Sequence, residues 1–313
     1  MEKKFIPPFK TGHLTVGDGH SLYYECWGNK SGKPVLFLHG GPGTGFFEKD
    51  KRFFNPKVWN VIFFDQRGSG KSTPFGSIKN NTTQDLVEDV NRLLSFLKIE
   101  KIFLFGGSWG SSLALIYATQ NLKKVTGMLL RGIWLCDKKS IEHYANGGIK
   151  DHFPEVWERF EGMVPKNRRQ NLVKFYFDQM ISGDPKIREK YAYEYGIYED
   201  SIVHLNYDPQ KIERTLKKAK YYHSLSPLEA HYILNNCFIP EGYILNNASQ
   251  LSKLPLSIIH GRYDFVCEPI SAYVLHKKIK GSKLFFTTAG HSAGDPENEE
   301  KLTSEMRRFE RII

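Results

Sequence analysis

The sequence predicts an α/β fold, in which a mostly parallel central sheet carries helices on both faces and an inserted helical segment. Three observations lead to this prediction. Short, uninterrupted apolar runs recur along the chain and end in Gly or Asp. Amphipathic stretches separate several of these runs, and such alternation is typical of a parallel sheet covered on both sides. Between Arg131 and Leu254 the apolar runs stop and the composition becomes helical.

The strands of this sheet are predicted from two kinds of pattern. Residues 13–16 and 21–28 alternate in strand fashion, and the GDGH stretch between them predicts a hairpin turn. Later runs are apolar throughout and rich in β-branched and aromatic side chains, which indicates strands buried on both faces. These runs are residues 34–40, 59–65, 101–107, 125–132, 254–261 and 283–290.

Helical patterns lie between and after the predicted strands, at residues 82–99, 111–121 and 296–313. The first begins with a Thr that can cap a helix, followed by apolar residues three and four apart. Residues 137–245 contain few strand-like runs. We therefore expect a helical cap domain at 137–245, inserted into a sheet domain made of residues 1–136 and 246–313.

Charge and hydropathy exclude two classes of partner. The 313-residue chain has a net charge of +10, but residues 137–245 carry 16 basic and 16 acidic side chains, and no basic run exceeds two residues. A scattered excess of this kind is typical of a solvated surface, so we expect no nucleic-acid partner. No apolar run approaches the ~20 residues that a membrane span needs, so we expect no membrane partner.

The four cysteines are far apart and lack the spacing of metal ligands; they are Cys26, Cys136, Cys237 and Cys267. We therefore expect reduced thiols, no bound metal and a cytoplasmic location. The opening residues, MEKKFIPPFK, contain no apolar core of a secretory signal, which agrees with that location.

One stretch, residues 63–74 (FFDQRGSGKSTP), imitates a phosphate-binding loop because it contains Gly70-Lys71-Ser72. A P-loop also requires a glycine five residues before Gly70, where the backbone wraps the phosphates. Asp65 occupies that position. The stretch therefore needs another explanation than nucleotide binding.

A nucleophile is predicted at Ser108. The sequence Gly106-Gly107-Ser108-Trp109-Gly110 matches the G-x-S-x-G pattern, directly after one predicted strand and before a helix. This turn is so sharp that only small flanking residues avoid clashes, and it holds the serine hydroxyl above the sheet. A Gly/Ser-rich helix cap is the alternative, but the strand and helix on either side favour the nucleophile.

A serine nucleophile needs a base, and the base needs an orienting carboxylate. Asp264 follows one predicted strand and His291 follows the next, so both belong at the same edge of the sheet as Ser108. The chain order Ser, Asp, His is the one expected for a nucleophile elbow of this type. We therefore predict Ser108, Asp264 and His291 as the catalytic residues, whereas His260, inside a strand run, is predicted to be structural.

An oxyanion hole requires backbone N–H groups aimed at the charge that develops during acyl transfer. One N–H should come from Trp109, which follows the nucleophile. The other should come from the glycine-rich loop His39-Gly40-Gly41-Pro42-Gly43 after the first parallel strand. Gly41 is the predicted donor, with Gly40 as the neighbouring alternative.

Taken together, five segments resemble the proline iminopeptidase (prolyl aminopeptidase) family of the α/β-hydrolase fold. They are HGGPG (39–43), DQRGSGKS (65–72), GGSWGS (106–111), GRYD (261–264) and AGH (289–291). The resemblance runs from about residue 10 to the C-terminus. It implies that residues 65–72 form the loop after the second core strand, with Asp65 and Arg67 fixing that loop near the active-site mouth.

The resemblance also implies a substrate, namely peptides with an N-terminal proline. The free imino group of proline is a cation at neutral pH and needs carboxylates when it is buried. The family supplies glutamates from the cap, and the matching stretches here are YGIYE (195–199) and SPLEAHY (226–232). Glu199 and Glu229 are therefore the expected substrate-binding pair.

This chain departs from the family pattern, because Tyr195 and Tyr198 stand where the family usually has Trp, and Pro227 replaces an Arg. We therefore expect a less strict preference for proline. The implied reaction needs no cofactor. Two alternatives stay open: another serine hydrolase of the same fold, such as an esterase or amidase, and a non-catalytic small-molecule binding protein. Cys267, three residues after Asp264, is expected to make the enzyme sensitive to bulky thiol reagents.

Overall fold

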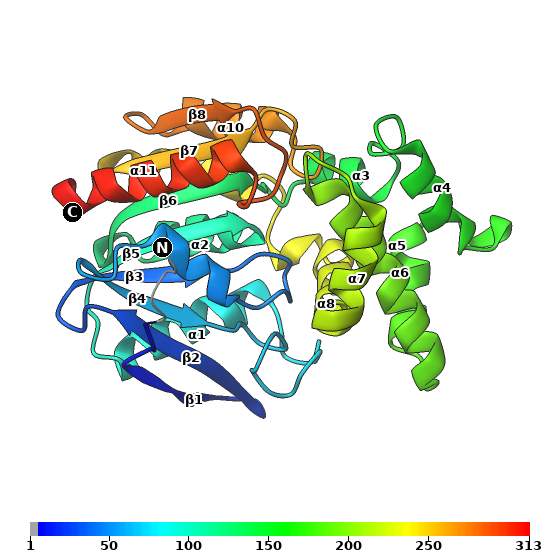
Figure 1. Ribbon diagram of the computed structural model, residues 1–313, viewed down its shortest axis with the longest axis horizontal. Coiled ribbons are helices and arrows are strands. Elements are labelled where there is room, and N and C mark those ends of the chain that lie inside the picture. The colour runs from blue at the N-terminus through cyan, green and yellow to red at the C-terminus, as the bar shows by residue number, and fades with distance from the viewer. Residues whose placement is uncertain (1–5) are drawn as a thin grey trace.

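The computed structural model describes residues 6–313, and in this part of the chain eight strands form one sheet in the order β1-β2-β4-β3-β5-β6-β7-β8 (Figure 1). The strands β1, β2 and β4 pair antiparallel, and β4, β3, β5, β6, β7 and β8 pair parallel. Their bounds are β1 Lys10–Gly17, β2 His20–Gly28, β3 Lys33–Leu38, β4 Trp59–Phe64, β5 Ile102–Ser108, β6 Val125–Ile133, β7 Leu256–Gly261 and β8 Lys283–Thr287. The α/β-hydrolase sheet and the N-terminal hairpin predicted from the sequence are both confirmed.

Helices cover both faces of this sheet. On one face, α1 (Thr83–Phe96), α2 (Trp109–Gln120) and α10 (Pro269–Lys278) contribute to one large apolar cluster. On the other face, α11 (Pro296–Ile312) and the short 3₁₀ helix η1 (Glu48–Phe53) pack on a second cluster, rich in phenylalanine. The predicted start of α1 is confirmed, because the Thr82 hydroxyl accepts the Asp85 backbone N–H while Asp85 accepts the Thr82 N–H.

Between β6 and β7 the chain leaves the sheet and forms a group of helices beyond its carboxyl edge (Figure 1, right). These helices are α3 Lys138–Ala145, α4 Pro154–Gly162, α5 Leu172–Met180, α6 Pro185–Val203, α7 Pro209–Ala219, α8 Tyr222–Leu234 and α9 Tyr243–Asn247. Short 3₁₀ helices lie at Leu122–Lys124 (η2), Lys166–Arg168 (η3), Asn236–Phe238 (η4) and Ala248–Lys253 (η5).

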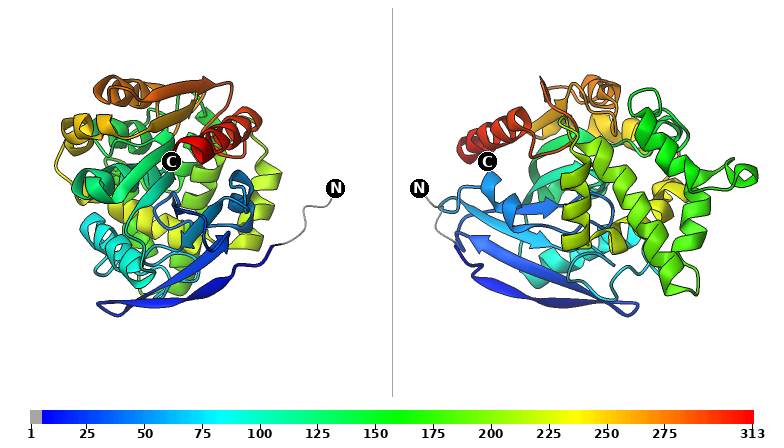
Figure 2. Two further views of the ribbon diagram at one scale, coloured as in Figure 1. Left: turned by 90° about the vertical axis from the view of Figure 1, so that its left-hand side faces the viewer. Right: turned by 45° about the vertical axis from the view of Figure 1, so that its right-hand side comes forward.

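We propose that this helical group is the cap domain. Its predicted end, residue 245, falls inside α9, which contacts α2 and α10 of the sheet domain. We therefore propose that the cap ends in the loop before α9. In Figure 2, α6, α7 and α8 extend over the carboxyl edge of the sheet.

The order of the strands reverses at β3. This strand lies between β4, which follows it in the chain, and β5, which comes later. In open α/β sheets, ligands bind outside the carboxyl ends of the strands at such a reversal. The loop after β3 and the end of β5 meet at this point, and both carry predicted site residues.

No helix within residues 6–313 combines the length and the apolar character that crossing a membrane requires.

Candidate active site

Ser108 is the last residue of β5 and the N-cap of α2, and its backbone has φ 56° and ψ −129°. Such a backbone is strained for any residue with a side chain. The neighbouring glycines are required by sterics. A Cβ on Gly106 would lie 2.3 Å from the carbonyl oxygen of Gly110, and a Cβ on Gly110 would lie 2.0 Å from that of Leu38. The G-x-S-x-G sequence therefore forms the sharp turn that the pattern predicts.

Asp264 and His291, from the loops after β7 and β8, meet beneath the cap. The Nδ1 atom of His291 lies 2.8 Å from Asp264 Oδ2, and both side chains are buried. The other carboxylate oxygen, Oδ1, accepts the backbone N–H groups of Val266 at 3.1 Å and Cys267 at 2.8 Å. His291 and Ser108 line one cleft. Asp264 and His291 are therefore in hydrogen-bond contact at the carboxyl edge of the sheet, and Ser108 lies in the same cleft as His291.

The charge state of Asp264 follows from its neighbours. Burial by itself raises the pKa of this carboxyl, but His291, His260 and the Cys267 N–H together outweigh it, so the pKa lies below its ordinary value. Asp264 is thus an anion that can hold the His291 ring in one tautomer. His260 is buried and has a lowered pKa, and its Nδ1 accepts the Ile133 N–H at 3.1 Å. These contacts fit the structural role predicted for His260.

Cys267 lies beside this pair, since ligand atoms of Asp264, Cys267 and His291 all lie within 4.8 Å of one another. That spacing could suit a metal, but metals bind the thiolate. Burial, followed by the charge of Asp264, raises the pKa of the Cys267 thiol well above its ordinary value. Asp264 and His291 are hydrogen-bonded to each other, so this cluster fits a catalytic pair.

The glycine-rich loop after β3 approaches Ser108 closely. A Cβ on Gly40 would lie 3.3 Å from the Ser108 Cβ, and Gly41 has φ 99°, a conformation that favours glycine. Gly41, Ser108 and Trp109 line the same pocket. Trp109 begins α2, so its N–H is one of the free donors of a helix N-terminus.

Gln66, which the sequence interpretation did not single out, joins the two sides of this arrangement. Its side-chain NH₂ donates to the His39 carbonyl at 2.9 Å, and its Oε1 accepts the Trp109 indole N–H at 2.9 Å. Its backbone N–H donates to His39 Nε2 at 2.9 Å. Burial lowers the pKa of His39 to about 4, so this ring is neutral and can accept. The sequence could have indicated Gln66, because this residue lies within the DQRGSG stretch.

In the structure, the contacts of residues 65–72 account for this stretch without a bound nucleotide. The Asp65 carboxylate accepts the backbone N–H of Phe46 at 3.0 Å and that of Lys71 at 2.7 Å. Arg67 forms two hydrogen bonds with the buried Asp89, at 2.7 and 2.8 Å. A Cβ on Gly70 would lie 2.2 Å from the Asp65 carboxylate, so this glycine makes room for a side chain. These contacts fit the loop-fixing roles predicted for Asp65 and Arg67.

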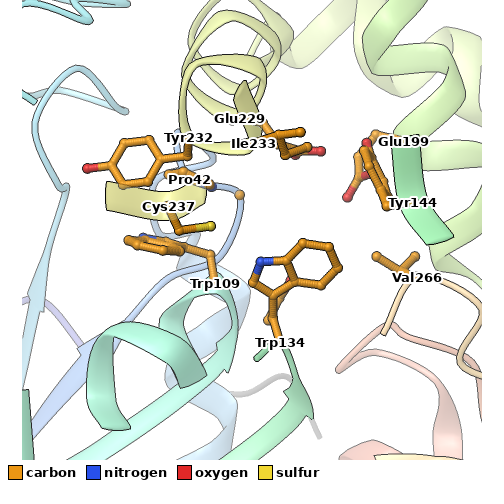
Figure 3. A pocket seen from close by; sticks show the side chains of 12 residues that line it. Pro42, Trp109, Trp134, Tyr144, Glu199, Glu229, Tyr232, Ile233, Cys237 and Val266 are labelled. Atoms are coloured by element: carbon orange, nitrogen blue, oxygen red, sulfur yellow. The ribbon is translucent and has the colours of Figure 1, made fainter. Parts of the chain in front are cut away.

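A pocket extends from Ser108 into the cap, and two carboxylates face it (Figure 3). Glu199 comes from α6 and Glu229 from α8, and both are buried. The Tyr144 hydroxyl donates to Glu199 Oε2 at 2.6 Å. Glu229 Oε2 has no hydrogen-bond partner among residues 6–313. The remaining wall of the pocket is mostly aromatic or apolar, and consists of Pro42, Trp109, Trp134, Tyr232, Ile233, Cys237 and Val266.

Two acids in so small a space resist ionisation. Burial raises the pKa of Glu199 to about 7, although the Tyr144 hydroxyl opposes the shift. Burial and then the charge of Glu199 raise the pKa of Glu229 well above its ordinary value. A cation between these groups would relieve both effects. A positively charged group of a substrate would therefore be stabilised at this site.

The residues that depart from the family pattern lie close to this pocket but do not line it. The Tyr198 hydroxyl donates to the Tyr144 carbonyl at 2.7 Å. The buried Tyr195 hydroxyl has no partner in the described part of the chain. Pro227 lies inside α8, two residues before Glu229. Tyr144 and Trp134 were not predicted, because nothing in their local sequence marks them as pocket residues.

The fold and this site define a hydrolase of the α/β-hydrolase class. A family model described as alpha/beta hydrolase fold matches residues 33–179. An esterase from Exiguobacterium antarcticum aligns with a TM-score of 0.65 over 96% of this chain and 100% of its own, at 22% identity. An esterase from Rhodococcus sp. ECU1013 aligns with a TM-score of 0.62 at 18% identity, over 96% of this chain and 98% of its own. At these identities the likeness shows the fold alone.

Sequence relatives narrow the class to one family. A probable proline iminopeptidase from Leptolyngbya boryana is 38% identical over 92% of this chain and 90% of its own length. The proline iminopeptidase of Arabidopsis thaliana is 39% identical over 93% of this chain and 77% of its own. That of Xylella fastidiosa (strain 9a5c) is 38% identical over 95% of both. The chain belongs to the proline iminopeptidase family.

Proposed function

We propose that this protein is a serine exopeptidase that releases proline from the N-terminus of peptides. The observation that carries the proposal is the pair of buried carboxylates, Glu199 and Glu229, in one pocket with Ser108. A protonated proline nitrogen placed between them would supply the missing positive charge and give Glu229 Oε2 the partner that it lacks. An esterase substrate without a cation would leave both acids uncompensated.

The proposed mechanism is acyl transfer through the predicted triad. The Ser108 hydroxyl attacks the carbonyl carbon of the N-terminal residue while His291 takes its proton. Asp264, bonded to His291 Nδ1 at 2.8 Å, holds the ring in place and stabilises the imidazolium. The N–H groups of Gly41 and Trp109 stabilise the oxyanion. His291 then protonates the leaving amine, and a water molecule releases proline from Ser108 by the reverse sequence.

The cap accounts for removal of a single residue. Glu199, Glu229 and Tyr144 line the same pocket as Ser108, and we propose that they form its closed end. A residue preceding the proline would have to displace these buried side chains and would bring no cation to them. The pocket therefore favours a free N-terminus, and short peptides beginning with proline are the proposed substrates. We also propose a cytoplasmic location, which is supported by the free, buried state of Cys26, Cys136, Cys237 and Cys267.

The test compares proline, alanine and leucine arylamides with a simple p-nitrophenyl ester, using wild type, Ser108→Ala and Glu229→Gln. We expect turnover of the proline arylamide that is lost in Ser108→Ala and strongly reduced in Glu229→Gln. Ester hydrolysis should survive Glu229→Gln, since the ester carries no cation. Ester hydrolysis without any arylamide turnover in wild type would contradict the exopeptidase proposal and favour an esterase.

A further inference from the structure

A large cleft lies on the His291 side of Ser108, with a volume of about 730 Å³. It shares Gly41, Ser108 and Glu199 with the small pocket that faces Glu229. His291 lines the cleft and does not line the pocket. In the proposed reaction His291 protonates the leaving amine, so the cleft receives the part of the peptide that follows the scissile bond. This role of the cleft rests on the proposed function.

Most charged groups of this cleft already have protein partners. Four acids accept hydrogen bonds from nearby groups: Asp50 from the Phe47 N–H, Asp200 from the Tyr221 hydroxyl, Asp208 from the Lys211 N–H and Asp295 from the Gly290 N–H. Among the bases, Arg52 pairs with Glu299 at 2.9 Å, and His204 lies 3.7 Å from Asp295.

Arg131 is the exception nearest the reacting centre. It lies near the end of β6, in register with Gly107, the residue before Ser108. Its guanidinium fills the space beside Gly107, where a Cβ would lie 2.5 Å from Arg131 Nη2 and 2.9 Å from Nε. Its Nη1 donates to the His291 carbonyl. The cation is therefore anchored between Gly107 and the His291 carbonyl, next to the predicted nucleophile and base in the sequence.

No carboxylate among residues 6–313 lies within 4.0 Å of this guanidinium, and its Nε and Nη2 groups donate to no acceptor in that part of the chain. Arginine stays charged at all relevant pH values and offers five N–H donors in a planar fork that suits a carboxylate. A buried cation that has no directly paired anion is costly, and the carboxylates of Asp264, Asp50 and Asp295 act on Arg131 from beyond 4.0 Å. The arrangement leaves a place for a substrate anion.

We infer that Arg131 binds the C-terminal carboxylate of a dipeptide whose first residue is proline. In a dipeptide this carboxylate is separated from the leaving nitrogen by one Cα, so it remains close to His291, whose carbonyl Arg131 already contacts. Each additional residue moves the carboxylate about 3.5 Å farther along an extended chain. The site therefore prefers dipeptides with a free carboxylate to amidated or longer peptides.

The test measures kcat/KM for Pro-Gly and for Pro-Gly amide, which differ in this charge alone. Wild type should prefer the free acid by about tenfold or more, the usual effect of a charge-assisted hydrogen bond. In Arg131→Met the preference should fall to about one, and Arg131→Lys should keep part of it. The matched control is Arg52→Met, which removes a cation of the same cleft that Glu299 already neutralises and should leave the preference unchanged.

The ratio of two substrates separates specificity from damage to the site. If Arg131 merely supports the His291 loop, Arg131→Met will slow both substrates equally and the preference will persist, which would overturn the inference. A wild-type preference near one would overturn it as well, even if no Arg131 variant folds. Failure of the proposed function would look different, because neither Pro-Gly nor a proline arylamide would then be hydrolysed by wild type.

Discussion

Replacing Glu199 with Gln should make the protein more stable and less active, and the gain in stability should depend on pH. The substitution keeps the shape of the side chain and an oxygen that can accept the Tyr144 hydroxyl, now 2.6 Å from Glu199 Oε2. It removes the group whose pKa burial raises from 4.5 to about 7. Unfolded chains ionise this carboxyl near its ordinary pKa, whereas the folded protein keeps it protonated until the pH is higher.

The magnitude follows from the size of this shift. One pKa unit corresponds to about 1.4 kcal/mol, so wild type loses about 3 kcal/mol of stability as the pH rises through the interval between the two pKa values. At pH 5 the loss is about 1 kcal/mol, and it levels off near pH 8. Gln cannot ionise and avoids the whole cost. For a chain of this length, 3 kcal/mol corresponds to about 5 °C in Tm.

The assay is thermal unfolding of wild type and Glu199→Gln at several pH values between 5 and 8. The matched control is Glu194→Gln on the same helix, where Glu194 pairs with the half-exposed Arg159 at 2.8 Å. Loss of such a surface pair costs about 1 kcal/mol or less, so this control should not be stabilised. A Tm difference for Glu199→Gln that is negative, or that does not grow with pH, would refute the reasoning.

The activity change should have the opposite sign. One of the two anions that would face the proline nitrogen is lost, and an ion pair at about 4 Å is worth up to about 4 kcal/mol near a protein surface. Part of that energy goes into ionising Glu199 itself, so we expect kcat/KM for a proline arylamide to fall about 100-fold. Stability gained together with activity lost is the behaviour of a residue kept for binding.

Three further outcomes are expected. Ser108→Ala should lower kcat by about 10⁴-fold or more while leaving Tm within a few degrees, because the alanine inherits the same backbone; ample residual turnover would exclude Ser108 as the nucleophile. Arg67→Met should lower the free energy of unfolding by about 3–5 kcal/mol, because it leaves the buried Asp89 without its ion-pair partner. Adding Asp89→Leu should restore most of this free energy, as measured by urea unfolding. Gln66→Leu should lower kcat by about tenfold or more with little change in KM, because Trp109 and the loop after β3 lose their common support; an effect confined to KM would contradict that positioning role.

The sheet and its reactive edge could be predicted because each is encoded locally. Short apolar runs become buried strands, and Gly106 and Gly110 are dictated by contacts with backbone atoms a few residues away or on the next strand. Asp264 and His291 could be placed because each follows a strand directly, so the topology alone brings them to one edge. Chain order and strand ends were sufficient information for this part of the site.

The cap was less predictable for a physical reason. The helices α6 and α8 bury side chains on several sides, so their sequences have no clean polar face. Pocket residues such as Tyr144 and Trp134 do not differ from core residues until the fold brings them near Glu199. The two glutamates were predicted through a family resemblance, not from periodicity. Gln66 was not predicted because its role consists of hydrogen bonds to His39 and Trp109, which lie 27 and 43 residues away in the sequence.

The structure divides binding from chemistry between two parts of the chain. Ser108, Asp264, His291 and the oxyanion loop belong to the sheet, whose strands fix their positions, whereas Glu199 and Glu229 come from cap helices. The same sheet architecture supports the esterases to which this fold is similar, and a fold does not determine a substrate. We therefore propose that selectivity for an N-terminal cation resides in the cap, where two buried acids with raised pKa values face the pocket. Arg131 would extend the same principle to the other end of a dipeptide, because it has no ion-pair partner within 4.0 Å among residues 6–313.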